Sequence, residues 1–99
     1  MYDVIIIGSG PAGISAAIYL KRAKKNILIV SNGKSALQKA HKIENYYGIE
    51  NISGEELHKV GIKQVERLGV PIEKDEVINI SFDRHFIVTT VNREFEAKK

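Results

Sequence analysis

The chain opens with Val4-Ile5-Ile6-Ile7-Gly8-Ser9-Gly10-Pro11-Ala12-Gly13, an apolar run followed by the pattern G-x-G-x-x-G. An unbroken run of β-branched residues is typical of a parallel strand that is covered on both faces. Proline suits the first position of a helix, because that position needs no backbone N–H donor. These residues therefore predict a strand that ends at Ile7, a glycine-rich turn, and a helix that begins at Pro11.

The three glycines of this turn match the pattern of a dinucleotide-binding loop. Gly8 permits the sharp turn out of the strand, Gly10 lets a pyrophosphate approach the backbone, and Gly13 lets the helix pack closely on the strand. Free N–H groups and the positive dipole end of the first helical turn would face the diphosphate. We therefore predict a dinucleotide site, with a glycine-rich turn that binds nothing as the alternative. Its residues are Gly8, Ser9, Gly10, Pro11, Ala12 and Gly13.

The remaining patterns predict an α/β fold. The first helix should run to about Lys24 with Ile14, Ala17 and Ile18 facing inward, and Ile27–Val30 should form a second buried strand. Strand, helix and strand in this order predict a right-handed parallel βαβ unit. We expect the outer edge of the first strand, Val4–Ile7, to be unpaired.

Beyond the second strand we expect mostly loop, with a short helix over Ser35–His41. Ser53 and Glu56 have the spacing of a capping box, which predicts a second helix that stops at Gly69. Its inward stripe should comprise Leu57, Val60 or Gly61, Val65 and Leu68. A short strand that begins with Val70-Pro71-Ile72 and an antiparallel meander over Glu76–Phe82, Phe86–Val91 and Glu94–Ala97 should complete the fold.

Composition excludes several classes of function. The chain has 99 residues and no Cys, which excludes a disulfide framework, a cysteine zinc site and a dithiol redox centre within it. No apolar stretch approaches the roughly 20 residues that span a bilayer, and Asp3 stands where a signal peptide would be basic. Basic residues are spread along the chain, and the Lys21–Lys25 cluster is expected at a solvated helix end. We therefore expect a cytoplasmic protein with neither a membrane nor a nucleic acid as partner.

The sequence offers no convincing catalytic residue or metal centre. His41 and Glu44 could share a helical face, but two ligands do not make a metal site. His58 is expected on the exposed side of the second helix. We therefore predict neither a catalytic acid, base or nucleophile nor a bound metal ion.

The identity of the dinucleotide stays open on residue chemistry alone. NAD-binding units commonly place an acid at the end of the second strand for the ribose hydroxyls, whereas this chain has Val30-Ser31-Asn32-Gly33-Lys34 there. Ser31 or Asn32, which are uncharged, could form a hydrogen bond with a ribose. Lys34 could instead face the 2′-phosphate of NADP, so FAD and NADP are both candidates.

Two further segments, Ile43-Glu44-Asn45-Tyr46-Tyr47-Gly48 and Ile52-Ser53-Gly54-Glu55-Glu56-Leu57, give the chain a family resemblance. Together with residues 3–18 and the strands after Gly69, they resemble the N-terminal FAD segment of the thioredoxin reductase-like flavoproteins. These belong to the pyridine nucleotide-disulfide oxidoreductases that have two dinucleotide domains. The glycine pattern is shared by many FAD enzymes, whereas the other two segments are more particular to this family.

The resemblance implies a partial Rossmann-like FAD-binding domain, with residues 1–99 as its N-terminal part. The NAD(P)H domain, the Cys-x-x-Cys pair and the closing FAD segment would lie in a longer parent protein. That parent would be a homodimer that passes electrons from NAD(P)H through FAD to a disulfide, with a thioredoxin-like protein as candidate partner. The 99-residue chain alone is expected to be inactive. A non-catalytic FAD- or NADP-binding module is the alternative.

The resemblance also assigns residues. Asn45 would lie beside the flavin end of FAD, the Val77 backbone would meet the adenine, and Ser31 would sit near the adenosine ribose. Two positions depart from the family. Ala36 stands where a glutamine often reaches the flavin, and Tyr47 stands where a proline is usual.

Overall fold

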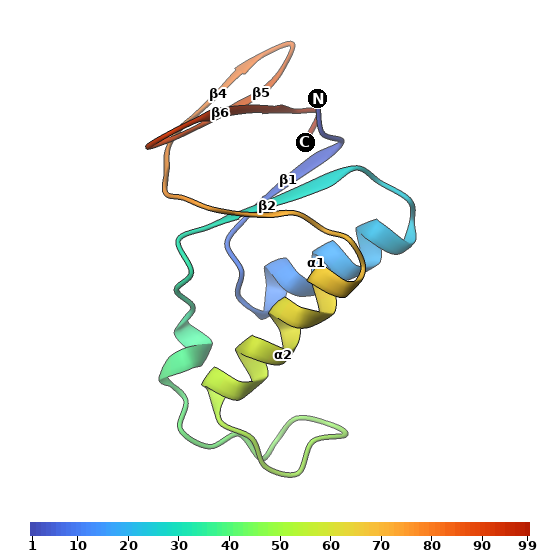
Figure 1. The fold of residues 1–99 in the computed structure, drawn as a ribbon, viewed down its shortest axis with the longest axis vertical. Helices are drawn as coiled ribbons and strands as arrows, with labels where there is room; N and C mark the ends of the chain where they lie inside the picture. The colour runs from blue at the N-terminus through green and yellow to red at the C-terminus, as the bar shows by residue number, and fades with distance from the viewer.

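The computed structural model describes all residues from 1 to 99, and it confirms an α/β fold. Two helices lie side by side against a small parallel sheet, and an antiparallel meander lies beyond the other side of that sheet (Figure 1). The elements are β1 (Val4–Ile7), α1 (Pro11–Arg22), β2 (Ile27–Ser31), the 3₁₀ helix η1 (Ala36–Lys39), α2 (Gly54–Arg67), β3 (Ile72–Lys74), β4 (Val77–Asp83), β5 (His85–Thr90) and β6 (Glu94–Ala97).

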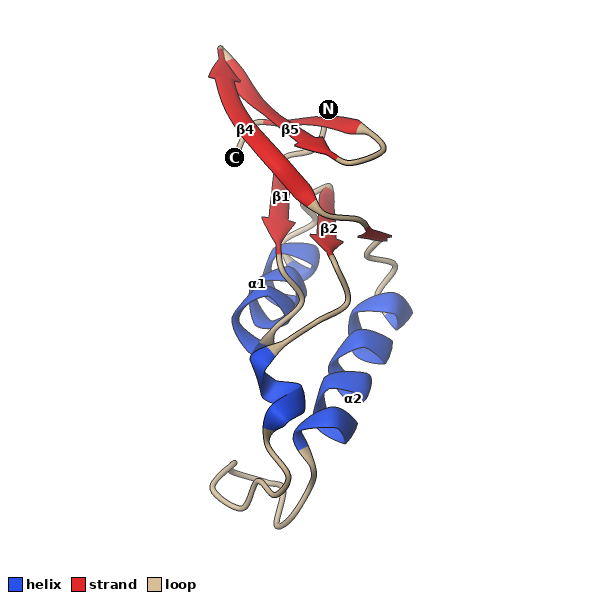
Figure 2. Cartoon of the chain, turned by 90° about the vertical axis from the view of Figure 1, so that its left-hand side faces the viewer, coloured by secondary structure: helices blue, strands red, loops and turns tan.

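The parallel sheet has β2 at its centre, between β1 and β3 (Figure 2). Val4 pairs with Ile27, and Ile29 pairs with Ile72. All five residues of β2 are buried, as expected for a central strand whose apolar side chains are covered on both faces. The predicted parallel βαβ unit is therefore confirmed.

The core lies between the sheet and the two helices. Ile14 and Ala17 supply the α1 side of it, as predicted. The stripe on α2 is narrower than predicted, because Val60 and Leu68 are 53% and 39% exposed. Gly61 rather than Val60 faces Ile14. The fully packed cluster comprises Ile14, Ala17, Ile27, Ile29, Val65 and Val70.

Both long helices end at residues with positive φ. The α1 helix ends at Arg22, slightly before the predicted limit, because Lys24 has φ +63° and cannot continue a right-handed helix. Gly69 has φ +83° and ends α2, which confirms its predicted role.

The segment between β2 and α2 is more ordered than the prediction of mostly loop. The η1 helix is shorter than the predicted Ser35–His41, and Ser35 and Gln38 cap it reciprocally. Ile43 then pairs with Ile52, so that residues 43–52 form a small hairpin. Its turn has Gly48 at the third position with φ +89°, a conformation that glycine adopts readily.

Gly54 lets α2 begin directly against η1. A Cβ at this position would overlap the carbonyl oxygen of Leu37, and the Gly54 amide donates to the Ala40 carbonyl at 2.7 Å. The Ser53 hydroxyl caps the same helix by accepting from the Glu56 amide at 3.1 Å. The start of α2 is therefore fixed by a backbone contact as well as by its cap.

The meander of β4, β5 and β6 agrees with the predicted strands to within one residue at each end. It leads back to the parallel sheet, and Figure 1 shows the two chain ends close together.

The prediction of an unpaired outer edge along β1 is wrong for the first part of that strand. The Ile5 amide donates to the Lys99 carbonyl at 2.9 Å, and the Lys99 amide donates to the Asp3 carbonyl at 3.1 Å. No helix is long and apolar enough to cross a membrane.

Two glycines of α2 should respond oppositely to alanine. We expect Gly54→Ala to destabilise the fold by roughly 1–3 kcal/mol, because the new methyl group would overlap a carbonyl oxygen in the packed start of the helix. Gly61→Ala is the matched control, because its Cβ would lie 3.4 Å from a methyl group of Ile14. The Gly61→Ala substitution should leave the free energy of unfolding unchanged or raise it by up to about 1 kcal/mol, because alanine has a higher helix propensity than glycine. Urea unfolding of both variants measures the difference, and equal stabilities would contradict the η1 contact.

Candidate functional site

The glycine-rich turn has the geometry that its residues predict. Gly8 has φ +108°, and a Cβ there would meet nothing. A Cβ on Gly13 would collide with the Gly8 carbonyl oxygen and lie 3.2 Å from Ile6 Cγ2. The first turn of α1 therefore packs directly on the end of β1, which only glycine at position 13 allows.

The N-terminus of α1 has no cap from the protein. Gly10 occupies the N-cap position without a side-chain hydrogen bond, and the first turn contains no acidic residue. The amides of Ala12 and Gly13 find no acceptor. Both η1 and α2, by contrast, have a serine cap. An uncapped helix start with free amides is suited to an anion such as a phosphate group.

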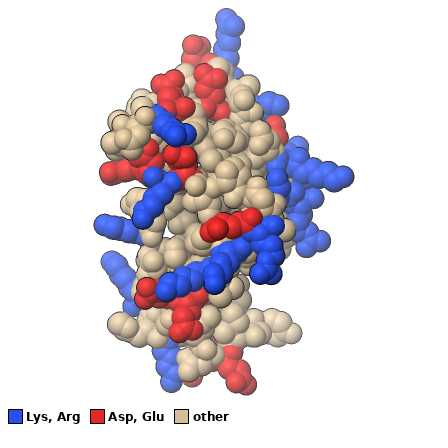
Figure 3. All heavy atoms as spheres, viewed as in Figure 1, with Lys and Arg blue, Asp and Glu red and all other residues tan.

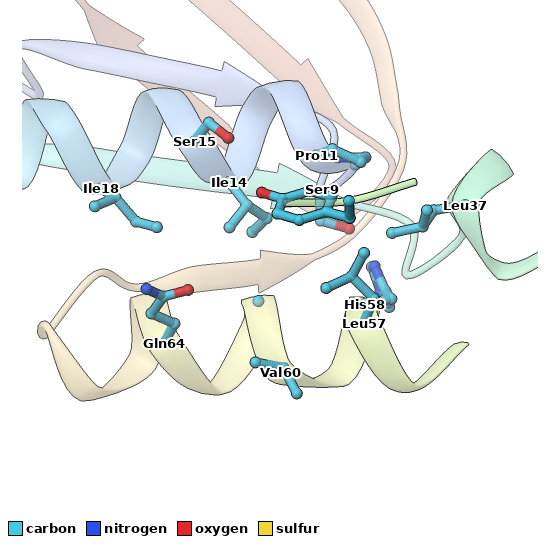
Figure 4. Close-up of a pocket in the computed structure, with 13 residues that line it drawn as sticks. Ser9, Pro11, Ile14, Ser15, Ile18, Leu37, Leu57, His58, Val60 and Gln64 are labelled. Atoms are coloured by element: carbon cyan, nitrogen blue, oxygen red, sulfur yellow. The ribbon is translucent and has the colours of Figure 1, made fainter. Parts of the chain in front are cut away.

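One cavity lies beside this turn, between α1, α2 and η1 (Figure 4). Its volume is about 210 Å³, and its walls combine apolar and polar residues. We call it the helix cavity. It is lined by Ser9, Gly10, Pro11, Ile14, Ser15, Ile18, Leu37, Tyr46, Leu57, His58, Val60, Gly61 and Gln64.

His58 lies in the wall of the helix cavity, so its predicted place on the exposed side of α2 is wrong. The residue is only 9% exposed. The cause is the contact at Gly54, because residues four apart share one face of a helix. The face that Gly54 presses against η1 therefore also carries His58 inward, toward Leu37 and Ser9 (Figure 4).

A second cavity, which we call the strand-end cavity, lies where β1 and β2 end and β4 begins. Its volume is about 280 Å³. It brings together three of the predicted site residues, Gly8, Ser31 and Val77. The carboxyl ends of parallel strands are the usual binding edge of such sheets. The cavity is lined by Ile7, Gly8, Val30, Ser31, Asn32, Asp75, Glu76 and Val77.

A buried hydrogen bond joins the glycine-rich turn to β2. The hydroxyl oxygens of Ser9 and Ser31 lie 2.7 Å apart, and the Gly33 amide donates to the Ser31 oxygen at 3.0 Å. Both serine residues are buried. Their hydroxyl groups therefore hold the turn in place against the end of β2.

Asp75 organises the far wall of the strand-end cavity. Its carboxylate accepts hydrogen bonds from the Thr90 hydroxyl at 2.7 Å, the Asn92 side chain at 3.2 Å and the Glu76 amide at 2.8 Å. The Thr90 hydroxyl, first among these donors, lowers the pKa of Asp75 below its usual value of 3.8. The carboxylate therefore stays ionised at neutral pH.

The predicted site residues fall into separate places. Ser9, Gly10 and Pro11 line the helix cavity, and Ala12 and Gly13 supply the free amides between the two cavities. Asn45 is exposed in the hairpin and lines neither cavity. Sequence reasoning missed four residues that line the cavities, and no local pattern in the sequence marks them: Leu37, His58, Asp75 and Glu76.

On the face in Figure 3, Lys and Arg side chains gather along the right-hand edge, where α1 ends in the same view of Figure 1, and both signs of charge are interspersed over much of the remaining surface. No group of three or more His, Cys, Asp or Glu side chains is arranged to hold a metal ion. The uncapped helix start and the two cavities are therefore the strongest candidate for a ligand site in this chain.

Comparison with known proteins places the whole chain in one group. A family model described as pyridine nucleotide-disulphide oxidoreductase matches residues 2–99. The thioredoxin reductase of Aquifex aeolicus is 41% identical over 103 residues, which cover 99% of this chain and 32% of that protein. The thioredoxin reductase of Ureaplasma parvum is 41% identical over 90 residues, which cover 87% of this chain and 28% of that protein.

Solved structures give the same result. The crystal structure of Lactococcus lactis thioredoxin reductase matches 99% of this chain with a TM-score of 0.93 and 37% identity, and the match covers 33% of that chain. The Streptococcus pyogenes thioredoxin reductase gives a TM-score of 0.92. This chain thus spans about a third of the length of these relatives.

The Asp75 network should make stability depend on pH. The lowered pKa of Asp75 means that its contribution is complete above about pH 4 and is lost as pH falls through the folded-state pKa. Asp75→Asn should therefore lower the melting temperature at pH 7, and the difference from wild type should shrink at pH 3 and below. Asp83→Asn, at the β4–β5 turn, is the control and should change little. If the melting temperature of Asp75→Asn differs from that of wild type by the same amount at pH 7 and at pH 3, the charge of the carboxylate does not contribute to stability.

Proposed function

Because the chain belongs to the pyridine nucleotide-disulphide oxidoreductase family, we propose that it forms the FAD-binding part of an enzyme that passes electrons from NAD(P)H through flavin to a disulfide. The names of its relatives support a thioredoxin-like protein as the disulfide substrate. The resemblance extends the proposal to a homodimeric parent that acts in the cytoplasm.

The observation that carries the proposal is the uncapped N-terminus of α1 between two cavities. A dinucleotide is a long molecule with its diphosphate in the middle. Free amides at Ala12 and Gly13 fit that diphosphate, and the strand-end cavity beside Gly8 fits one of its two ends. A Cβ on Gly10 would meet only the Ser35 hydroxyl at 3.5 Å, so the backbone there is open to a close approach.

In this proposal the chain binds and orients the cofactor, and the flavin supplies the electron chemistry when bound. The first turn of α1 holds the diphosphate, and the strand-end cavity holds the adenosine around Ser31 and the Val77 backbone. The Ser9–Ser31 hydrogen bond fixes the position of the glycine-rich turn relative to the strand-end cavity. The resemblance assigns the flavin end to Asn45, which the exposed hairpin presents to solvent. We propose no catalytic acid, base or nucleophile in this chain.

Purification of the full-length parent tests the proposal. A yellow protein that NADPH bleaches, and that an added disulfide restores, is the expected result. A yellow protein that NADPH leaves unchanged would instead support the alternative of a non-catalytic FAD-binding module. A colourless protein that binds neither FAD nor NADP would overturn both.

Gly10→Val should weaken FAD binding by the parent about tenfold or more, because a branched side chain would occupy the approach of the diphosphate. The melting temperature should stay close to wild type, since space beside residue 10 contains only the Ser35 hydroxyl. Gly10→Ala is the graded control, with a smaller loss of affinity. Fluorescence titration with FAD measures both variants, and unaltered affinity of Gly10→Val would count against the loop as the diphosphate site.

Asn45→Leu should weaken FAD binding by about 0.5–1.5 kcal/mol, the contribution of one hydrogen bond, and should shift the flavin absorbance. Asn51→Leu is the matched control, because Asn51 is exposed in the same segment and has no assigned role. If the two variants have the same FAD affinity and the same flavin absorbance, Asn45 makes no contact with the flavin.

A further inference from the structure

We propose that Ser31 is a positioning residue, which orients the Ser9 hydroxyl group so that Ser9 donates a hydrogen bond to an anion at the start of α1. The inference rests on the proposed function, because that anion would be the diphosphate of the dinucleotide. Ser31 then acts on the ligand through Ser9, and not through the direct ribose contact that the family resemblance assigns to it.

The two serine hydroxyl groups form a buried pair. Their oxygens lie 2.7 Å apart, and the residues are only 2% and 6% exposed. Ser9 lines the helix cavity together with Gly10 and Pro11, at the start of α1 (Figure 4). A buried hydroxyl group needs a hydrogen-bond partner in the protein or in a bound ligand. The pair is therefore an observation about this site that is independent of the uncapped helix start.

The Gly33 amide makes the two hydroxyl groups unequal. It donates to the Ser31 oxygen at 3.0 Å and occupies one of the two lone pairs of that oxygen. Only one hydroxyl hydrogen can lie between the two serine oxygens, so the other hydrogen is left for an acceptor outside the pair. The direction of the Ser9–Ser31 hydrogen bond decides which serine offers that hydrogen.

An anion at the start of α1 selects one direction of this hydrogen bond. If Ser31 donates to Ser9, the Ser9 hydrogen is free for the anion, beside the free amides of Ala12 and Gly13. If Ser9 donates to Ser31 instead, only the lone pairs of Ser9 are left, and these repel an anion. The bound state is therefore a chain of donors that runs from the Gly33 amide through Ser31 and Ser9 to the anion.

Each hydrogen bond in such a chain polarises the next one, so the bond from Ser9 to the anion depends on the hydroxyl group of Ser31. Removal of the Ser31 hydroxyl would leave the Ser9 side chain in place but would let its hydrogen turn away from the anion. The Ser31 hydrogen is committed to Ser9 in this state. It is therefore not available to a ribose oxygen in the strand-end cavity, which Ser31 also lines.

The test separates the two roles of Ser31 with two probes, sulfate for the anion and adenosine for the ribose. The ¹⁵N-labelled chain is titrated with each probe at constant ionic strength, and amide shifts give the affinity and the place of binding. Ser9→Ala should lower the sulfate affinity about three- to tenfold. Ser31→Ala should lower the sulfate affinity about two- to threefold and leave the adenosine affinity unchanged.

Three further variants show whether Ser31 acts through Ser9. The double variant of Ser9→Ala and Ser31→Ala should bind sulfate no more weakly than Ser9→Ala alone. Ser31→Thr keeps the hydroxyl group and should retain the wild-type sulfate affinity. Ser31→Cys keeps the volume but only a weak donor, so it should behave as Ser31→Ala does. Ser81→Ala, in the exposed part of β4, is the control and should bind both probes as wild type does.

Other results would overturn the inference. If Ser31→Ala lowers the adenosine affinity, alone or together with the sulfate affinity, Ser31 contacts the ribose or supports the whole site, and the inference is wrong. If the losses of sulfate affinity from Ser9→Ala and Ser31→Ala add in the double variant, the two residues act independently, and the inference is again wrong. The proposed function remains in both cases. If sulfate shifts no amide of residues 8–13 in wild type, the proposed diphosphate site fails, and the inference fails with it.

Discussion

The contact between the first turn of α1 and the end of β1 depends on the absence of a side chain at residue 13. Any larger residue would push the helix away from the Gly8 carbonyl and from Ile6. Because the helix starts so close to the strand, its free amides lie at the carboxyl edge of the parallel sheet. The Ser9–Ser31 hydrogen bond and the position of the helix start beside the strand-end cavity depend on this close approach.

Much of this arrangement could be predicted from local patterns. The β-branched runs in β1 and β2, the proline at the start of α1 and the glycine after α2 each act through neighbouring residues, and the structure confirms the strands and helix ends that they predict. The expectation that β1 is covered on both faces is wrong, because the strand is only partly buried and Ile7 is 49% exposed. Propensity, capping and periodicity are short-range effects, so a single sequence displays them directly. The glycine-rich turn was predictable for the same reason, since its strand and helix are adjacent in the chain.

The features that the sequence did not reveal depend on contacts between distant residues. His58 is buried because Gly54 presses α2 against η1, and nothing near residue 58 signals that contact. Asp75 and Glu76 line the strand-end cavity because Ser31 pairs with Lys74, a contact between residues far apart in the chain. The sequence shows that no acid follows β2, but the acids that the β3–β4 junction adds to the cavity wall depend on the register of the sheet.

The hydrogen bonds that join residues 2–5 to residues 96–99 have a consequence for biosynthesis. The strand β1 leaves the ribosome first, yet the backbone that pairs with its outer edge is translated almost a hundred residues later. During that interval the edge of a strand of isoleucine and valine has no partner, and such an edge readily pairs with other nascent chains. The order of synthesis therefore leaves the outer edge of the earliest strand open to wrong pairing until residues 96–99 have been translated.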